Sequence, residues 1–191
     1  TNGVEVEEDS DLRERAKHAL EFAGKATYSS LESAIRSVEG VRSLLIEDKP
    51  EGVPGIVKVI VDGGDMDKIL HIIDETRASG IKVEVFRPRI VYINVSLTLT
   101  LEKEVSSTQA ATEAEKRVRS YISSLEIGDD VLYSRVIESA LDVRGVWDVT
   151  NVRITAHRDG EIVESEKENI EISSEERAEP RTINISFETR E

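Results

Sequence analysis

The sequence predicts an α+β fold with two subdomains, each with helices packed on a small mixed or antiparallel sheet. Two observations predict this class. A helix pattern that ends on a glycine and passes directly into a strand occurs twice, around Gly40 and around Gly145. In the first half, the patterns also follow the order helix, helix, strand, strand, helix, strand. This order predicts hairpin-like neighbours, whereas repeated parallel βαβ units would alternate single strands with single helices.

The two helix–glycine–strand segments resemble each other in sequence. Both contain Glu-Ser-Ala followed by a branched aliphatic residue, starting at Glu32 and at Glu138. Both then carry Val-x-Gly-Val, ending at Val41 and at Val146, with a one-residue difference in spacing. Glycine adopts the left-handed conformation that ends a helix without a steric penalty from a Cβ atom. We therefore expect two related halves, each with a helix folded back on a sheet.

Length and composition restrict the class of protein. The chain has 191 residues, 38% of them apolar, with a formal net charge of −14 and no cysteine. The negative charge argues against binding to nucleic acid or to anionic membranes, and the lack of cysteine excludes disulfides, thiolate metal sites and cysteine nucleophiles. No apolar run approaches the roughly 20 residues of a membrane-spanning helix. Because the chain starts at Thr1 without a methionine, we expect a fragment or processed form of a longer protein.

The first subdomain is expected to comprise residues 1–87. Its patterns predict, in order, a helix over about 11–24, a helix from about 29 to 39, a strand over 41–48, a turn over 49–55, a strand over 57–61, a helix after the N-cap Asp65 and a strand over 81–85. The buried stripe of the helix after Asp65 is expected to consist of Ile69, Leu70, Ile73 and Thr76. Arg87-Pro88 marks the boundary, because proline disfavours the helical conformation of the preceding residue.

The second subdomain is expected to comprise residues 88–191 and to begin with the longest strand. Apolar and polar residues alternate there with a period of two, so one face packs on a core. The expected core residues are Val91, Ile93, Val95, Leu97, Leu99 and Leu101. A helix follows, capped by Ser106, Ser107 or Thr108, with the expected inner stripe Ala111, Ala114, Val118, Tyr121, Ile122 and Leu125.

Strands are expected from Gly145 to the end of the chain. Asp159-Gly160 is a strong signal for a two-residue hairpin. Ile162, Val163, Ile170 and Ile172 are expected to continue the strands. An acidic linker is then predicted to contain Glu175, Glu176 and Glu179 and to end at Pro180. The last predicted strand alternates Ile183, Ile185 and Phe187.

The residue types that carry chemistry form no recognisable site, so we predict no catalytic, cofactor-binding or metal-binding residues and no cofactor. His18, His71 and His157 lack metal-ligand spacing. The segment 62–67 faintly resembles a calcium loop but lacks its ligand spacing, and it is interpreted as a turn and a capped helix. The carboxylates at 129–130 and 164–179 are expected to be solvated rather than held in a pocket that shifts their pKa values.

Trp147 is the only tryptophan in the chain. We interpret it as a core residue, with an anchor at a partner interface as the less favoured alternative, because tryptophan is enriched at such interfaces.

Several motifs in series resemble the baseplate J-like family of contractile phage tails and related injection systems. The segments that carry the resemblance are Asp9-Ser10-Asp11-Leu12-Arg13-Glu14-Arg15-Ala16, Gly24-Lys25-Ala26-Thr27, Leu31-Glu32-Ser33-Ala34, Val38-Glu39-Gly40-Val41, Pro54-Gly55-Ile56-Val57-Lys58-Val59, Val61-Asp62-Gly63, Gly80-Ile81-Lys82-Val83, Arg87-Pro88, Tyr133-Ser134, Val143-Arg144-Gly145-Val146-Trp147-Asp148-Val149 and Asn169-Ile170-Glu171-Ile172 before Pro180.

This resemblance implies the C-terminal part of a non-enzymatic structural protein that builds baseplate wedges around the central hub. The implied partners are other baseplate, hub or spike, and sheath-end proteins, with self-association in the intact assembly and with neither nucleic acid nor membrane insertion. The implied location is the cytoplasm during assembly and then the phage virion or tail-like particle. The alternative is a small-molecule-binding regulatory or enzymatic α+β domain, which would need a pocket with converging polar groups.

Overall fold

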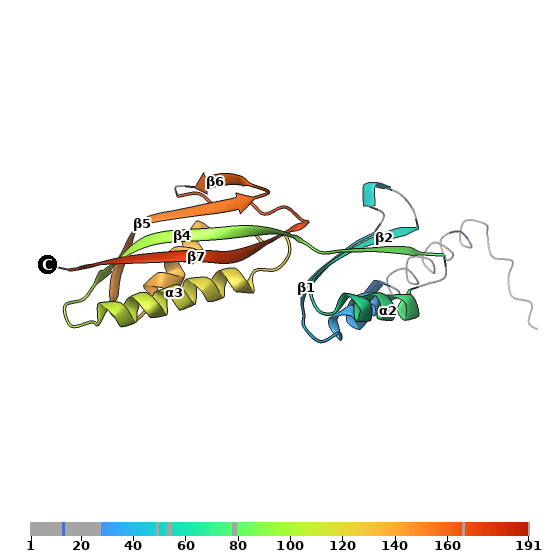
Figure 1. The fold of residues 1–191 in the computed structure, drawn as a ribbon, viewed down its shortest axis with the longest axis horizontal. Helices are drawn as coiled ribbons and strands as arrows, with labels where there is room; N and C mark the ends of the chain where they lie inside the picture. Colours follow the sequence, from blue (N-terminus) through green and yellow to red (C-terminus); the bar gives the residue numbers. More distant parts are fainter. Residues whose placement is uncertain are drawn as a thin grey trace, which may run out of the picture. The chain divides into compact units, whose positions relative to one another are not determined.

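The structure is a computed structural model of the chain and describes residues 13, 28–48, 50–52, 55–77, 80–165 and 167–190. The chain divides into two compact units, Thr1–Phe86 and Arg87–Glu191. Each unit has its own sheet (Figure 1). Each also has its own hydrophobic core. The predicted α+β class with two subdomains is therefore confirmed. The helix expected over about 11–24 lies, apart from Arg13, outside the described residues.

The sheet of the first unit is mixed and has three strands in the order β1-β2-β3. Its elements are β1 (Val41–Asp48), η1 (Pro50–Gly52), β2 (Ile56–Gly63), α2 (Met66–Thr76) and β3 (Lys82–Phe86). β1 and β2 pair antiparallel, whereas β2 and β3 pair parallel. The expectation of hairpin-like neighbours thus holds for β1 and β2 and is wrong for β3, because α2 carries the chain back across the sheet before β3 begins.

The core of the first unit lies between one face of its sheet and its helices. Residues 28–36 are helical and contribute Leu31 and Ile35, while α2 contributes Ile69 and Ile73. These side chains pack with the face of β2 that carries Val57, Val59 and Val61. Each fully buried side chain of this size contributes roughly 1.5–3 kcal/mol of hydrophobic stabilisation.

One position of the predicted α2 stripe is wrong. Leu70 is 46% exposed, because only the side of α2 that carries Ile69 and Ile73 faces the three-stranded sheet.

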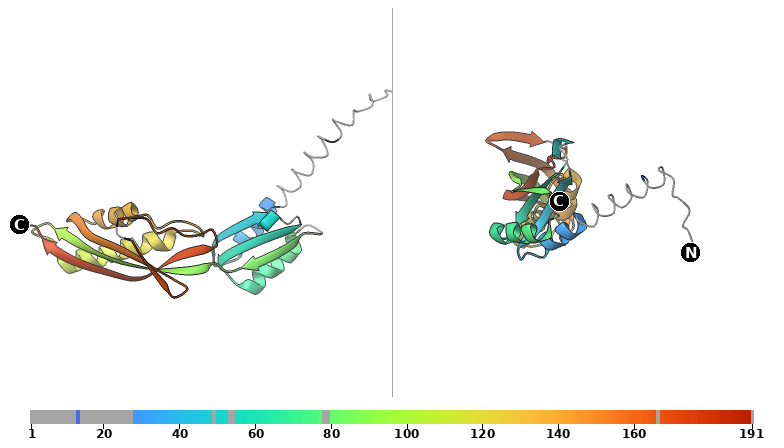
Figure 2. Two further views of the ribbon diagram at one scale, coloured as in Figure 1. Left: turned by 90° about the horizontal axis from the view of Figure 1, so that it is seen from above. Right: turned by 90° about the vertical axis from the view of Figure 1, so that its right-hand side faces the viewer.

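The sheet of the second unit has four strands in the order β6-β5-β4-β7. They are β4 (Arg89–Leu101), β5 (Val146–Arg158), β6 (Glu161–Ser165) and β7 (Glu176–Thr189). β4 pairs antiparallel with β5 and parallel with β7, and β5 pairs antiparallel with β6. Both Figure 1 and Figure 2 show β5, β4 and β7 running side by side.

The period-two pattern of β4 predicts its buried face correctly. All six expected core residues of this strand are at most 2% exposed. They pack against α3 (Ser107–Ser124) and α4 (Tyr133–Leu141). On α3, Ala114, Val118 and Ile122 are buried as predicted. Ala110 completes that stripe in place of Ala111, which is half-buried.

The internal repeat has the same backbone geometry in both units. Gly40 and Gly145 both have a φ of +86°. In each copy the residue after the glycine donates its N–H to the carbonyl of the valine three residues earlier, at 3.2 Å for Val41 to Val38 and at 3.1 Å for Val146 to Val143. The predicted helix–glycine–strand segments are therefore confirmed as equivalent turns.

The C-terminal part of the chain differs from the prediction in two places. The expected acidic linker is wrong, since β7 already begins at Glu176 and contains Glu179 and Pro180. Neither Ile170 nor Ile172 belongs to a strand, although Ile170 makes an isolated antiparallel bridge with Val131. The hairpin signal is correct, because Arg158 pairs with Glu161 and both turn residues have positive φ.

Candidate interaction surfaces

The titratable residues singled out from the sequence do not converge on one site. Among the described residues, no three His, Asp or Glu side chains are placed to hold a metal ion. His71 lies on the exposed side of α2, 3.4 Å from Glu75. His157 lies on β5, with its Nε2 atom 2.7 Å from Nδ2 of Asn94 on β4. His18 is outside the described residues.

The acidic segment at 62–67 has a structural role. Asp65 caps α2, with its Oδ1 accepting hydrogen bonds from the N–H groups of Asp67 and Lys68. Asp62 is buried at the end of β2 and accepts a hydrogen bond of 2.9 Å from Nη2 of Arg42. These contacts agree with the interpretation of a turn and a capped helix.

The carboxylates after α3 also bind the main chain. Asp129 accepts a hydrogen bond from the N–H of Glu126, and Asp130 accepts one of 2.7 Å from the N–H of Ile172. Asp130 therefore fixes the segment before β7 against the loop before α4.

Glu176 corrects the expectation that the acids at 164–179 are solvated. Its side chain is 4% exposed, and its carboxylate lies 3.0 Å from Nε of Arg158. The carboxylate also accepts a hydrogen bond from the N–H of Ser173, and Arg89 lies 3.9 Å away. A buried carboxylate needs such partners, because desolvation without them costs several kcal/mol. This cluster joins the first residue of β7 to the end of β5.

The face of the second sheet opposite α3 and α4 carries exposed aromatic side chains beside arginines. At one end, the Arg181 guanidinium lies 5.7 Å from the ring centroid of Tyr92. At the other end, the Arg190 guanidinium lies 3.6 Å from the ring centroid of Trp147. Tyr92 is 43% and Trp147 is 54% exposed. The expectation of a core tryptophan is therefore wrong.

The position of Trp147 follows from an irregularity in strand pairing. Thr100 pairs with Asp148 and Leu101 pairs with Val146, so Trp147 is the extra residue of a bulge. Such a bulge re-aims a side chain relative to regular alternation. Tryptophan, tyrosine and arginine are the residues most often found at the energetic centres of protein interfaces. This face, bounded by Trp147 and Tyr92, is thus a candidate docking surface for a protein.

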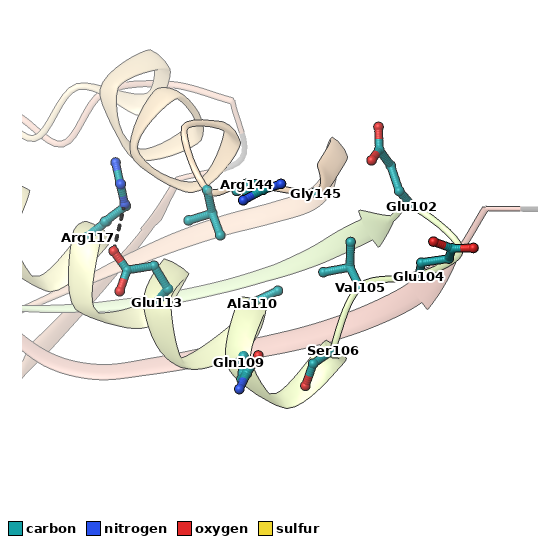
Figure 3. A pocket seen from close by; sticks show the side chains of 11 residues that line it. Glu102, Glu104, Val105, Ser106, Gln109, Ala110, Glu113, Arg117, Arg144 and Gly145 are labelled. Atoms are coloured by element: carbon teal, nitrogen blue, oxygen red, sulfur yellow. Dashed lines mark hydrogen bonds and ion pairs between the residues drawn. The ribbon is translucent and has the colours of Figure 1, made fainter.

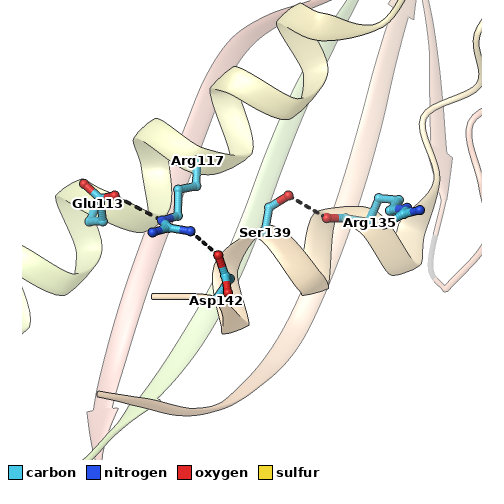
Figure 4. A network of polar contacts seen from close by, with 5 residues as sticks. All are labelled: Glu113, Arg117, Arg135, Ser139 and Asp142. Atoms are coloured by element: carbon cyan, nitrogen blue, oxygen red, sulfur yellow. Dashed lines mark hydrogen bonds and ion pairs between the residues drawn. The ribbon is translucent and has the colours of Figure 1, made fainter. Parts of the chain in front are cut away.

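The outer side of α3 and α4 is held together by polar contacts (Figure 4). Arg117 on α3 donates to Glu113 at 3.0 Å and also to Asp142 at the end of α4. The hydrogen bond from Arg117 to Glu113 is the main cause that raises the pKa of the Arg117 guanidinium. Tyr121 accepts a hydrogen bond of 2.9 Å from the N–H of Leu132, and burial raises the pKa of its phenol. These contacts fix the two helices relative to each other.

A groove of about 690 Å³ lies between the start of α3 and the turn before β5 (Figure 3). Its lining includes Glu102, Glu104 and Arg144, and Glu113 is already bonded to Arg117. A small-molecule site would present several unengaged polar groups toward one point. Two of the charged groups that line this groove, Glu113 and Arg117, are instead engaged with each other.

Comparison with known proteins finds a matching family model and a similar fold. A model of the Baseplate J-like protein C-terminal domain matches residues 93–186. A chain in the cryo-EM structure of the anti-feeding prophage (AFP) baseplate, 6-fold symmetrised, is similar over 77% of this chain, at 11% sequence identity and with a TM-score of 0.54. This chain spans about a third of that chain, 35% of its length. No curated protein matches the sequence.

Proposed function

We propose that the chain is a structural component of a phage-tail-like baseplate, because residues 93–186 match the model of the Baseplate J-like protein C-terminal domain. The expected resemblance to that family is confirmed by the match. In the proposed role, the chain builds wedges around the central hub through protein–protein contacts. The observation that carries the proposal is that the family match runs from β4 to β7 and so takes in the complete helix pair of the second unit.

The surface of the second unit supports a role in assembly. Trp147 and Tyr92 lie exposed at the two ends of a sheet face, each beside an arginine. The proposed partners are other baseplate proteins, hub or spike proteins and sheath-end proteins, together with further copies of this chain. In the described part of the chain, helices long and apolar enough to cross a membrane are absent. We propose assembly in the cytoplasm, followed by incorporation into a virion or tail-like particle.

The division of the chain suggests how such a component responds when the tail contracts. The boundary between the two units lies between residues 86 and 87 of the chain, directly before Pro88. We propose that Pro88 marks a joint, that each helix-on-sheet unit holds its own contacts, and that the units shift relative to each other during contraction. A catalytic role forms no part of this proposal.

The test is an affinity pull-down of the tagged full-length protein from its native cells, read by mass spectrometry. Recovery of sheath, tube, spike or baseplate proteins is the expected result. A Trp147→Ala variant is expected to lose part of this recovery, whereas Leu141→Ala, which removes an exposed apolar side chain on α4, away from this sheet face, serves as the matched control. Recovery of metabolic enzymes alone would instead favour the small-molecule-binding alternative.

A further inference from the structure

β7 is a long strand at the edge of its sheet. It spans Glu176–Thr189 and pairs on one side with β4, and no other described strand pairs with it. Figure 1 shows it along the outer side of β4. Edge strands expose a row of main-chain donors and acceptors, so natural proteins shorten them, cover them or interrupt them with proline and bulges. A strand of this length is therefore expected to be either protected or paired.

The first part of β7 is protected in several ways. The N–H of Gly128 donates to the carbonyl of Glu176 at 2.9 Å, so the loop after α3 covers this part of the edge. Pro180 has no N–H to donate, and the pairing with β4 shifts register directly after it, between Ile93 and Val95. The main-chain groups at this edge are thus protected against pairing with another strand from Glu176 to about Arg181.

The second part of β7 contacts α3 on the helix-covered face, but it contains neither a proline nor a register shift. Ile183–Thr189 pairs with Val95–Leu101 in an unbroken register. The N–H of Thr182 donates to Oδ1 of Asn94 on β4, and the N–H of Arg190 donates to the carbonyl of Leu101. The main-chain N–H groups of these two even-numbered residues therefore point toward β4. Since alternate residues of a strand direct their main-chain groups to opposite sides, the main-chain groups of the odd-numbered residues from 183 to 189 point away from β4.

The side chains of this segment also alternate. Ile183, Ile185 and Phe187 lie on the helix-covered face, because their partners on β4 are Val95, Leu97 and Leu99. Phe187 is nevertheless 48% exposed, which leaves an apolar side chain uncovered at the edge. Asn184, Ser186 and Glu188 lie on the opposite face and are exposed.

We propose that Thr182–Glu188 pairs antiparallel with the same segment of a second copy, across a two-fold axis at Ile185. The proposal deepens the proposed baseplate role and rests on it for its biological setting. In this register Ile183 lies opposite Phe187 of the other copy, and Asn184 lies opposite Ser186. Apolar side chains meet apolar ones on the helix face, and no two like charges lie opposite each other.

A second copy fits this edge because the segment is complementary to itself. In a two-fold antiparallel pair, the outward groups of Ile183, Ile185 and Phe187 on one copy meet the same set on the other. One strand pair of this length buries less than the roughly 1,200 Å² of a stable interface, so the pairing is expected to be weak in the isolated chain. In a multivalent assembly, the raised effective concentration strengthens it.

Disulfide trapping in the full chain tests the pairing and its register. The chain has no native cysteine, so each introduced thiol is the only one. Asn184→Cys and Ser186→Cys chains of different tag length are mixed and oxidised. In the proposed register these two positions face each other closely enough for a disulfide, whereas two copies of either single variant place their cysteines more than about 7 Å apart. The expected result is several-fold more dimer in the mixture than with either variant alone.

Two further variants control for chance collisions. Phe187→Lys, made in both cysteine chains, places a charge against Ile183 of the other copy and is expected to abolish the excess of mixed dimer. Ile162→Lys changes an exposed apolar side chain on the opposite edge strand and is expected to leave that excess intact. Equal dimer yield in all mixtures, or a yield no higher than that of Ser120→Cys on α3, would overturn the pairing.

The pull-down distinguishes this inference from the proposed function. Recovery of baseplate proteins without register-specific trapping overturns the β7 pairing and leaves the baseplate role. Register-specific trapping without recovery of such proteins supports the pairing and overturns the baseplate role.

Discussion

The guanidinium carbon of Arg190 lies 3.6 Å from the centroid of the Trp147 ring. The two residues come from different strands, since Trp147 is the bulge residue of β5 and Arg190 directly follows β7. The contact therefore spans the central strand β4. Its short distance places the cation on the face of the indole, where the attraction to the ring is strongest.

Arg190→Ala is expected to uncover this indole. Because Trp147 is the only tryptophan, its fluorescence reports the site without interference, and we expect stronger quenching by acrylamide in the variant. The free energy of unfolding should fall by only about 0.5–1 kcal/mol, the range for an exposed cation–π contact. Arg181→Ala removes the equivalent arginine at Tyr92 and should leave tryptophan quenching as in the wild type. Unchanged quenching in Arg190→Ala would contradict the stacked arrangement.

The contact between Glu176 and Arg158 is expected to matter more for stability. Glu176→Ala removes a buried carboxylate that faces Arg158 at 3.0 Å and accepts the N–H of Ser173. Because the arginine is itself one-third exposed, we expect a loss of about 2 kcal/mol rather than the larger cost of a fully buried pair. Urea denaturation measures the change. Glu188→Ala, at an exposed position of the same strand, should alter stability by less than about 0.5 kcal/mol.

Local patterns in the sequence predicted the parts of the fold that depend on local geometry. The alternation in β4 is a property of consecutive residues, so its buried face could be predicted directly. Gly40 and Gly145 were equally predictable, because a positive φ at the end of a helix is a requirement that glycine meets at the least cost. The Asp159-Gly160 hairpin was also predictable from local sequence alone.

Features that depend on the pairing of distant strands could not be predicted from such patterns. The exposure of Trp147 follows from a bulge against β4, and no signal at Trp147 itself indicates which residue is extra. Glu176 looked solvated because it lies among other acids, yet strand pairing brings Arg89 and Arg158 to it. The candidate docking face is therefore a result of the structure, whereas the lack of a local catalytic motif was visible in the sequence.

Gly145→Ala is expected to be more costly than Gly160→Ala. Both glycines have a φ near +90°, so both variants carry the strain of the left-handed conformation, about 1–2 kcal/mol. Only at Gly145 would the new Cβ also meet another side chain, at 2.3 Å from Cγ2 of Val105. We expect Gly145→Ala to lose about 1 kcal/mol more than Gly160→Ala in thermal or urea unfolding. Equal losses would show that Val105 moves away freely.

Tyr121 is expected to contribute to the alkaline sensitivity of the fold. Burial raises its pKa above the usual 10.0, so the folded protein holds the phenol proton more tightly than the unfolded chain does. This stabilisation is complete below about pH 10 and is lost as the pH rises through the folded pKa. Tyr121→Phe should lower stability at pH 7 by about 1 kcal/mol, through loss of the bond from Leu132, and should flatten the decline above pH 10. Tyr92→Phe, at an exposed ring, is the control, and an identical decline in both variants would contradict the assignment.

A flexible insertion at Pro88 tests the proposed joint between the two units. The cores of the units draw on separate residues, those before Phe86 and those after Ile90, so a short Gly-Ser insertion after Arg87 should leave each core intact. Circular dichroism and the unfolding midpoint are therefore expected to stay near the wild-type values. If the joint transmits motion between fixed contacts, the same insertion should impair formation of intact baseplates, as counted by electron microscopy of particles from complemented cells. An insertion of equal length after Asp159, in the β5–β6 hairpin, controls for added chain length. Normal assembly of the Pro88 insertion would count against a mechanical role for this position.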